Sequence, residues 1–219
     1  MSNLINGFVS SVKKYPDNNA LFVDGKYYSY KTLSGYVLGA QNLLDKVNAR
    51  DPLIGIYSFR SLWMYIAILS ILYKGKGYVP LNPTHPPKKN ISALLKSEVK
   101  TILTESNQLE KLLNFLPENG TVFKIIVLDK ENTSPDTFFK QHTILWANKS
   151  RLEIKKGELH KKTEKEFLHR IAYLLFTSGS TGSPKGIAVK HQNILHLIEV
   201  MTKKYGFNPD DRFIQNADY

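Results

Sequence analysis

Short apolar segments of strand-like composition alternate with longer helix-like segments between residues 53 and 128. We expect strands at Leu53–Ser58, Gly77–Leu81, Lys100–Thr104 and Phe123–Leu128, and helices at Leu62–Tyr73, Lys88–Lys96 and Gln108–Phe115. Each helix is long enough to return the chain across a sheet, so successive strands can run parallel. A parallel sheet is normally covered by helices on both faces. The sequence therefore predicts an α/β fold with a largely parallel sheet flanked by helices.

Two further regions flank this alternating core. Before it, the sequence predicts an amphipathic helix, a hairpin that turns at Asp24-Gly25, and a helix capped by Ser29. After it, a charged segment at 149–170 leads to strands at Ile171–Phe176 and Ile187–Lys190 and to a helix at Gln192–Lys204. We expect residues 1–170 to form a first α/β subdomain that includes the charged linker. Residues 171–219 would hold a loop-bearing hairpin and the start of a second subdomain.

Composition excludes several classes of protein. The chain has no cysteine, which rules out disulfides, a cysteine nucleophile and cysteine-ligated metal. Its longest apolar run, Leu62–Tyr73, is well short of the roughly 20 residues that cross a bilayer, and no secretory signal opens the sequence. A cytoplasmic protein without a membrane partner is therefore expected.

The net charge of +11 raises the question of a nucleic-acid partner. The densest cationic stretch, Lys149–Arg170, mixes eight Lys and Arg residues with four glutamates. Such mixed signs are typical of a solvated linker or surface hairpin rather than of a surface that follows phosphates. A basic nucleic-acid binder remains an alternative, but no specific nucleic acid is expected.

One dense motif carries the chemistry. Residues 177–186 read TSGSTGSPKG, with hydroxyl side chains, two glycines before Pro184, and a lysine after it. Glycines let backbone N–H groups approach an anion closely, and hydroxyl groups donate further hydrogen bonds to phosphate oxygens. A lysine adds a mobile positive charge. This combination suits the phosphates of a nucleotide.

The motif differs from a Walker loop, in which Gly-Lys-Ser/Thr opens a helix. Here Pro184 precedes Lys185, Gly186 follows it, and a strand comes next. A helix dipole should therefore not contribute to phosphate binding. The alternative interpretation is a flexible Gly/Ser turn. The order of strand, loop, strand and helix favours instead a binding loop that is held between regular elements.

Residues 171–176 followed by TSGSTGSPKG closely resemble the phosphate-loop motif of adenylate-forming enzymes. That superfamily includes the adenylation domains of nonribosomal peptide synthetases, D-alanine–carrier-protein ligases, acyl-CoA synthetases and luciferases. The segments Tyr28–Leu33 and Leu72–Pro86 resemble two other family motifs in the same order. Asn82 stands where the family usually has Asp, and Lys190 stands where Thr or Ser often precedes the histidine.

The resemblance implies the amino-terminal part of such an enzyme. It implies ATP with Mg²⁺, a carboxylic or amino acid, and a carrier-protein or coenzyme A thiol as the partners of the complete enzyme. The adenine, ribose and acid contacts and the catalytic lysine of the family would lie elsewhere, so we expect no catalytic residue in this chain. The isolated 219 residues should be inactive. The phosphate-binding residues would be Thr177, Ser178, Gly179, Ser180, Thr181, Gly182 and Lys185.

Motifs such as residues 78–81 and 211–213 look more like the amino-acid-activating branch that transfers to a phosphopantetheine thiol. An acyl- or aryl-CoA ligase is the first alternative, and a non-catalytic remnant that acts as a binding module is the second. The residues that select the acid are not expected in this sequence.

Overall fold

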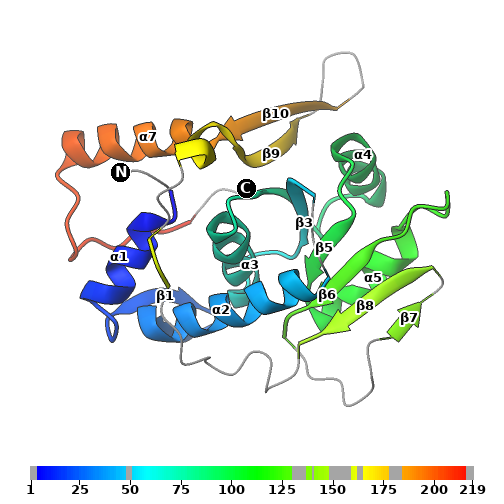
Figure 1. Ribbon diagram of the computed structural model, residues 1–219, viewed down its shortest axis with the longest axis horizontal. Helices are drawn as coiled ribbons and strands as arrows, with labels where there is room; N and C mark the ends of the chain where they lie inside the picture. Colours follow the sequence, from blue (N-terminus) through cyan, green and yellow to red (C-terminus); the bar gives the residue numbers. More distant parts are fainter. Residues whose placement is uncertain are drawn as a thin grey trace.

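The computed structural model describes residues 4–47, 51–129, 137–139, 141–147, 159–161, 165–177 and 184–215. Within these ranges the chain forms one eight-stranded sheet and one two-stranded sheet, with helices around them (Figure 1). The strand order of the large sheet is β10-β9-β4-β3-β5-β6-β8-β7.

Four parallel strands form the centre of the large sheet. They are β3 (Leu53–Tyr57), β4 (Gly77–Leu81), β5 (Thr101–Thr104) and β6 (Lys124–Val127). Strand β3 pairs with both β4 and β5, and β5 pairs with β6. The connecting helices are α3 (Leu62–Tyr73), α4 (Pro87–Ser97) and α5 (Ser106–Phe115). The expected elements are confirmed, and their ends differ from the prediction by at most two residues.

Helices cover both faces of this sheet. Apolar residues of α2 (Tyr30–Lys46) and α3 pack on one face, against Ile54 and Ile126 among others. Residues of α4 and α5 pack on the other face, against Val79 and Ile125. All five residues of β3 are buried, because neighbouring residues of a strand point to opposite faces and both faces are covered. The predicted α/β class is confirmed.

The amino-terminal elements also agree with the sequence. Helix α1 (Asn6–Lys14) precedes a hairpin of β1 (Asn19–Val23) and β2 (Lys26–Ser29). Asp24 and Gly25 both have positive φ, as a two-residue hairpin turn of type I′ requires. The Ser29 hydroxyl accepts a hydrogen bond from the amide of Thr32 at 3.2 Å, which confirms the predicted helix cap.

The carboxyl-terminal part joins the same sheet. It contains the short 3-10 helix η1 (Lys165–His169), β9 (Ile171–Thr177), β10 (Lys185–Lys190) and α7 (His191–Tyr205). Strand β9 pairs in parallel with β4, and β10 pairs antiparallel with β9 at the edge of the sheet. The expected boundary near residue 170 stays a prediction. Leu159, which lies in the charged segment, is buried beside α1 and β9.

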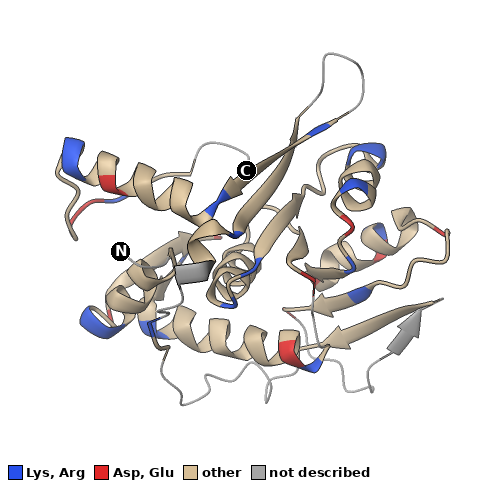
Figure 2. Cartoon of the chain, turned by 45° about the horizontal axis from the view of Figure 1, so that its top comes forward, with Lys and Arg blue, Asp and Glu red and all other residues tan. Residues whose placement is uncertain are grey.

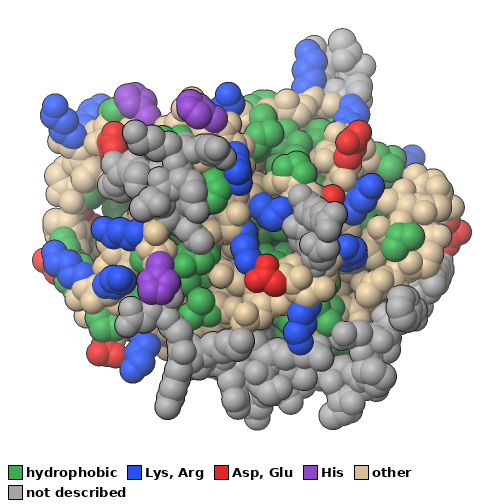
Figure 3. Space-filling model, in the orientation of Figure 1, with side chains coloured by type: hydrophobic (Ala, Val, Ile, Leu, Met, Phe, Trp, Pro, Cys, Tyr) green, Lys and Arg blue, Asp and Glu red, His purple; other side chains and the backbone are tan. Residues whose placement is uncertain are grey.

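Two strands were not predicted. Strand β8 (His142–Trp146) pairs in parallel with β6, and β7 (Thr137–Phe139) pairs antiparallel with β8 at the second edge. Lys, Arg, Asp and Glu residues are distributed over the described elements rather than gathered on one of them (Figure 2). On the face in Figure 3, lysine and arginine side chains alternate with apolar, acidic and histidine side chains. In the part of the chain that the structure describes, no helix combines the length and apolar character needed to traverse a bilayer.

Candidate functional site: the β9–β10 hairpin

The hairpin of β9 and β10 holds the two described ends of the predicted phosphate loop. Thr177 is the last residue of β9, Lys185 is the first of β10, and the two are paired across the hairpin. Both residues are exposed to solvent. Ser178, Gly179, Ser180, Thr181 and Gly182 lie outside the described residues. The structure therefore brings together the first and last members of the predicted set. They lie at the end of the hairpin that the loop joins, which is called the open end below.

The sheet determines where this open end lies. Tyr173 of β9 pairs in parallel with Tyr78 of β4, and the centroids of their rings are 5.7 Å apart. The preceding residue, Ala172, is fully buried. Because β9 is parallel to the central strands, its carboxyl end lies on the same side of the sheet as their carboxyl ends. Ligands bind on that side in open parallel sheets. In Figure 1 β9 ends on the side of α4, where β10 begins.

The segment after the loop is a strand, as the sequence predicted. Lys185 opens β10, and α7 begins only at His191, at the other end of that strand. The amino terminus of α7 therefore does not face the loop, and no helix dipole from α7 acts there. Lys190 lacks a capping side chain, but its amide donates to Oδ1 of Asn193 at 2.9 Å. This hydrogen bond satisfies the amide of the N-cap residue itself, whereas a serine or threonine at that position would accept from an amide of the first helical turn.

The base of the hairpin is tightly packed around Gly75 and Gly77. A Cβ atom at Gly77 would lie 2.5 Å from the backbone oxygen of Ile171, the first residue of β9. Gly75 has a φ of +67°, and a Cβ atom there would lie 2.6 Å from the ring of Phe167. These glycines allow the turn before β4 to approach the start of β9 closely.

A buried histidine, His191, and two cationic residues, Arg170 and Lys76, lie at this base. His191 is fully buried, and burial lowers its pKa below the usual value, as does the charge of Arg170. The ring lies against the backbone of Lys76, which raises the pKa, but no described residue gives either ring nitrogen a hydrogen-bond partner of good geometry. Burial also lowers the pKa of Lys76, although Asp51 opposes this shift.

A polar row follows the carboxyl ends of β4, β3 and β5. Asn82 accepts hydrogen bonds from the amide and hydroxyl of Thr84, both at 2.8 Å, and so performs the turn-forming role of an aspartate. Glu105 accepts from the hydroxyl groups of Ser58 and Ser61, the latter at 2.8 Å. Burial raises the pKa of Glu105, and the two serine hydrogen bonds partly offset that shift. These residues stabilise the loops that follow the carboxyl ends of the parallel strands, on the same side of the sheet as the open end of the hairpin.

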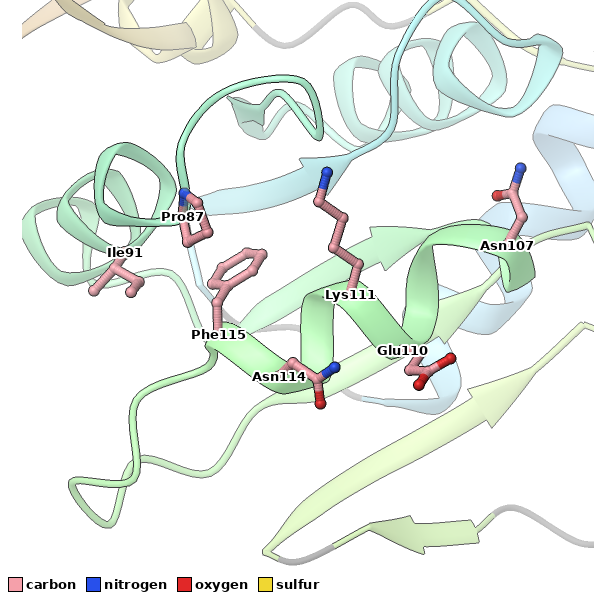
Figure 4. Close-up of a pocket in the computed structure, with 7 residues that line it drawn as sticks. All are labelled: Pro87, Ile91, Asn107, Glu110, Lys111, Asn114 and Phe115. Carbon is pink, nitrogen blue, oxygen red and sulfur yellow. The ribbon is translucent and has the colours of Figure 1, made fainter.

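A groove of about 560 Å³ lies elsewhere, between α4 and α5 (Figure 4). Pro87 and Ile91 line it from α4, and Asn107, Glu110, Lys111, Asn114 and Phe115 line it from α5. The Lys111 side chain donates a hydrogen bond to the carbonyl of Pro83. None of the described hairpin residues lines this groove.

Sequence reasoning missed one contact of the hairpin. The ammonium group of Lys96, on α4, lies 2.6 Å from the carbonyl oxygen of Pro184. The two residues are 88 positions apart, and no local pattern marks Lys96 as different from the other exposed lysines of α4.

Comparison with known proteins agrees with this geometry. The family model described as AMP-binding enzyme matches residues 8–219. Gramicidin S synthase 2 of Brevibacillus brevis is 29% identical over 95% of this chain and 4% of its own length. Indigoidine synthase of Dickeya dadantii (strain 3937) is 24% identical over 94% of this chain and 13% of its own length. The chain thus spans a small part of these curated relatives.

Solved structures show the same fold. The Vibrio cholerae adenylation domain AlmE, in complex with glycyl-adenosine-5'-phosphate, superposes with a TM-score of 0.76 at 24% identity. The match covers 96% of this chain and 39% of that one. The AMPPNP-bound form of the nonribosomal peptide synthetase FmoA3 gives a TM-score of 0.71 at 20% identity, over 96% of this chain and 19% of that one.

Proposed function

This chain belongs to the family of AMP-binding enzymes, and we propose that it supplies the phosphate-binding hairpin of a ligase that joins a carboxylic acid to ATP. The reaction forms an acyl-adenylate and releases pyrophosphate. The observation that carries this proposal is the hairpin itself. Thr177 and Lys185 face each other at its exposed open end, on the side of the sheet where the parallel strands have their carboxyl ends and where ligands bind in such sheets.

The proposed chemistry demands stabilisation of negative charge. A carboxylate oxygen attacks the α-phosphorus of ATP, and the bond to the β-phosphate oxygen breaks, so charge builds on the departing pyrophosphate. Lys185 would neutralise that charge. The hydroxyl groups of Thr177, Ser178, Ser180 and Thr181 would donate to β- and γ-phosphate oxygens, while Gly179 and Gly182 would allow close backbone approach.

Mg²⁺ enters this proposal together with ATP. Nowhere in the described ranges do three or more His, Asp or Glu side chains gather in a way that could hold a metal ion. We assign the ion no ligand among the described residues.

The acid is proposed to be an amino acid, and the acceptor a phosphopantetheine thiol on a carrier protein. The match to gramicidin S synthase 2 supports the first point, as does the structural match to an adenylation domain that holds glycyl-adenosine-5'-phosphate. The acceptor rests on resemblance to the amino-acid-activating branch. The first alternative is an acyl- or aryl-CoA ligase, and the second is a non-catalytic remnant of such an enzyme.

The test is carboxylate-dependent ATP–pyrophosphate exchange by the full-length gene product, across a panel of amino and aryl acids. We expect exchange with at least one acid, and no exchange by the isolated 219-residue chain. Full-length protein that binds ATP but exchanges with none of the acids would favour the non-catalytic remnant.

Lys185→Ala should slow exchange on the order of a hundredfold, with a smaller effect on the KM for the acid. Its matched control is Lys89→Ala, on an exposed lysine of α4. Equal rates for wild-type protein and the Lys185 variant would contradict the role of that lysine.

A further inference from the structure

The open end of the hairpin lies beyond the register that joins β9 to β4. The described register between β9 and β4 consists of the pair Tyr78 and Tyr173, and β10 is the edge strand. The first four of the six residues of β10, starting at Lys185, are exposed to solvent. The lysine that is proposed to meet a developing charge at a fixed place therefore lies on an exposed edge strand.

Helix α4 provides a rigid anchor close to this segment. Ala93 and Leu94, in the middle of its last turns, are buried in the core under the sheet. Lys96 follows them and directs its ammonium group to the Pro184 carbonyl oxygen, at 2.6 Å. A hydrogen bond from a charged donor is shorter and stronger than one between neutral groups. This contact ties the open end of the hairpin to the helical layer.

The atom that Lys96 holds determines the orientation of Lys185. The carbonyl of Pro184 and the amide nitrogen of Lys185 belong to one planar peptide group. The proline ring also fixes φ on the other side of that carbonyl. Fixing the carbonyl oxygen therefore fixes the plane from which the Lys185 backbone starts.

We propose that Lys96 is a positioning residue that orients Lys185 by holding the Pro184 carbonyl. This inference rests on the proposed function of the hairpin. Two other roles are possible for a lysine at this place: direct binding of the nucleotide phosphates, or a surface contact without consequence. A positioning residue affects chiefly kcat, whereas a phosphate ligand affects the KM for ATP and its dependence on salt.

The test compares Lys96→Met, Lys96→Arg and the control Lys89→Met in the full-length protein. Methionine keeps the length and apolar stem of lysine but removes the donor, and arginine restores a charged donor. Since Lys96 is exposed, we expect all three variants to keep the wild-type melting temperature.

We expect Lys96→Met to lower the kcat of ATP–pyrophosphate exchange by about three- to tenfold, with less than a twofold change in the KM for ATP. Lys96→Arg should recover most of the loss. Amide hydrogen exchange at Lys185 and Gly186 should be faster in Lys96→Met than in Lys89→Met.

Three results would overturn this inference. Equal kcat and amide exchange in the Lys96→Met and Lys89→Met variants would show a contact without consequence. A salt-dependent rise in the KM for ATP with unchanged kcat would show a phosphate ligand. Unchanged amide exchange at Lys185 would show that the carbonyl is held by other means. Absence of exchange by the wild-type protein would instead contradict the proposed function, and the amide exchange comparison would still decide the role of Lys96.

Discussion

The two ends of the β9–β10 hairpin are built in opposite ways. At the base, Gly75 and Gly77 admit close contact with residues 167–171, and His191 is fully buried. At the open end, Thr177 and Lys185 are exposed and are held through the hairpin and α4. The difference separates a structural joint, where substitution should affect stability, from a binding end, where it should affect function. Binding residues commonly lie on such exposed segments above a rigid scaffold.

Substitution of Gly77 should have the largest effect on stability. In Gly77→Ala the new Cβ atom would lie 2.5 Å from the backbone oxygen of Ile171, which a side-chain rotation cannot relieve. We expect the free energy of unfolding to fall by about 3 kcal/mol or more. Urea denaturation measures it. The control is Gly7→Ala, because a Cβ atom at Gly7 in α1 meets no atom of the described residues within 4 Å. Similar stability of the two variants would show that the base is not a close joint.

Substitution of Gly75 should have a smaller effect, of about 1–3 kcal/mol. Gly75 has a φ of +67°, and a Cβ atom there would approach the ring of Phe167, which can move more easily than backbone. Gly25→Ala is a matched control, because Gly25 has a φ of +73° with no atom within 4 Å of its added Cβ. The difference between the two variants in urea denaturation isolates the contact with Phe167. Equal losses would leave backbone strain as the whole effect.

The sequence predicted the scaffold better than the joint. The alternation between residues 53 and 128 marked every central strand and helix, because apolar periodicity follows directly from burial on two faces. Ser29 marked its cap because a hydroxyl group at that position satisfies a free backbone amide. By contrast, no helix-like sequence separates β7 and β8 from β6, so the alternation that marks the central strands is missing there.

The candidate site could be located from the sequence but not assembled from it. The motif marked Thr177 and Lys185, since residue types alone suggest affinity for phosphate. Their pairing across the hairpin depends on strand register, which the motif does not specify. The contact of Lys96 with Pro184, and the burial of His191, arise from tertiary packing of distant segments. Such contacts leave no local pattern to detect.

His191 should make the stability of the base depend on pH. Burial lowers the pKa of His191 in the folded state, while the unfolded chain has a value of about 6.5. Above that value His191 is neutral in both states and does not oppose folding. As the pH falls below it, the unfolded state binds the proton more readily, so the free energy of unfolding decreases.

Urea denaturation between pH 7.5 and pH 5 should therefore show a larger loss for wild-type protein than for His191→Gln. The exposed His196 provides the control, and His196→Gln should follow the wild-type profile. An identical pH profile for wild-type protein and both variants would mean that His191 gains a proton without disturbing the joint.

Substitution at the open end should have the smallest effect on stability. Lys185 is exposed and opens an edge strand, so Lys185→Ala removes little buried surface. We expect its free energy of unfolding to stay within about 0.5 kcal/mol of the wild-type value in urea denaturation. Combined with the large loss expected in pyrophosphate exchange, this result would sharpen the contrast between the two ends. If Lys185→Ala were as destabilising as Gly75→Ala, its loss of activity would reflect damage to the fold, and the open end would have to be regarded as part of the same structural joint.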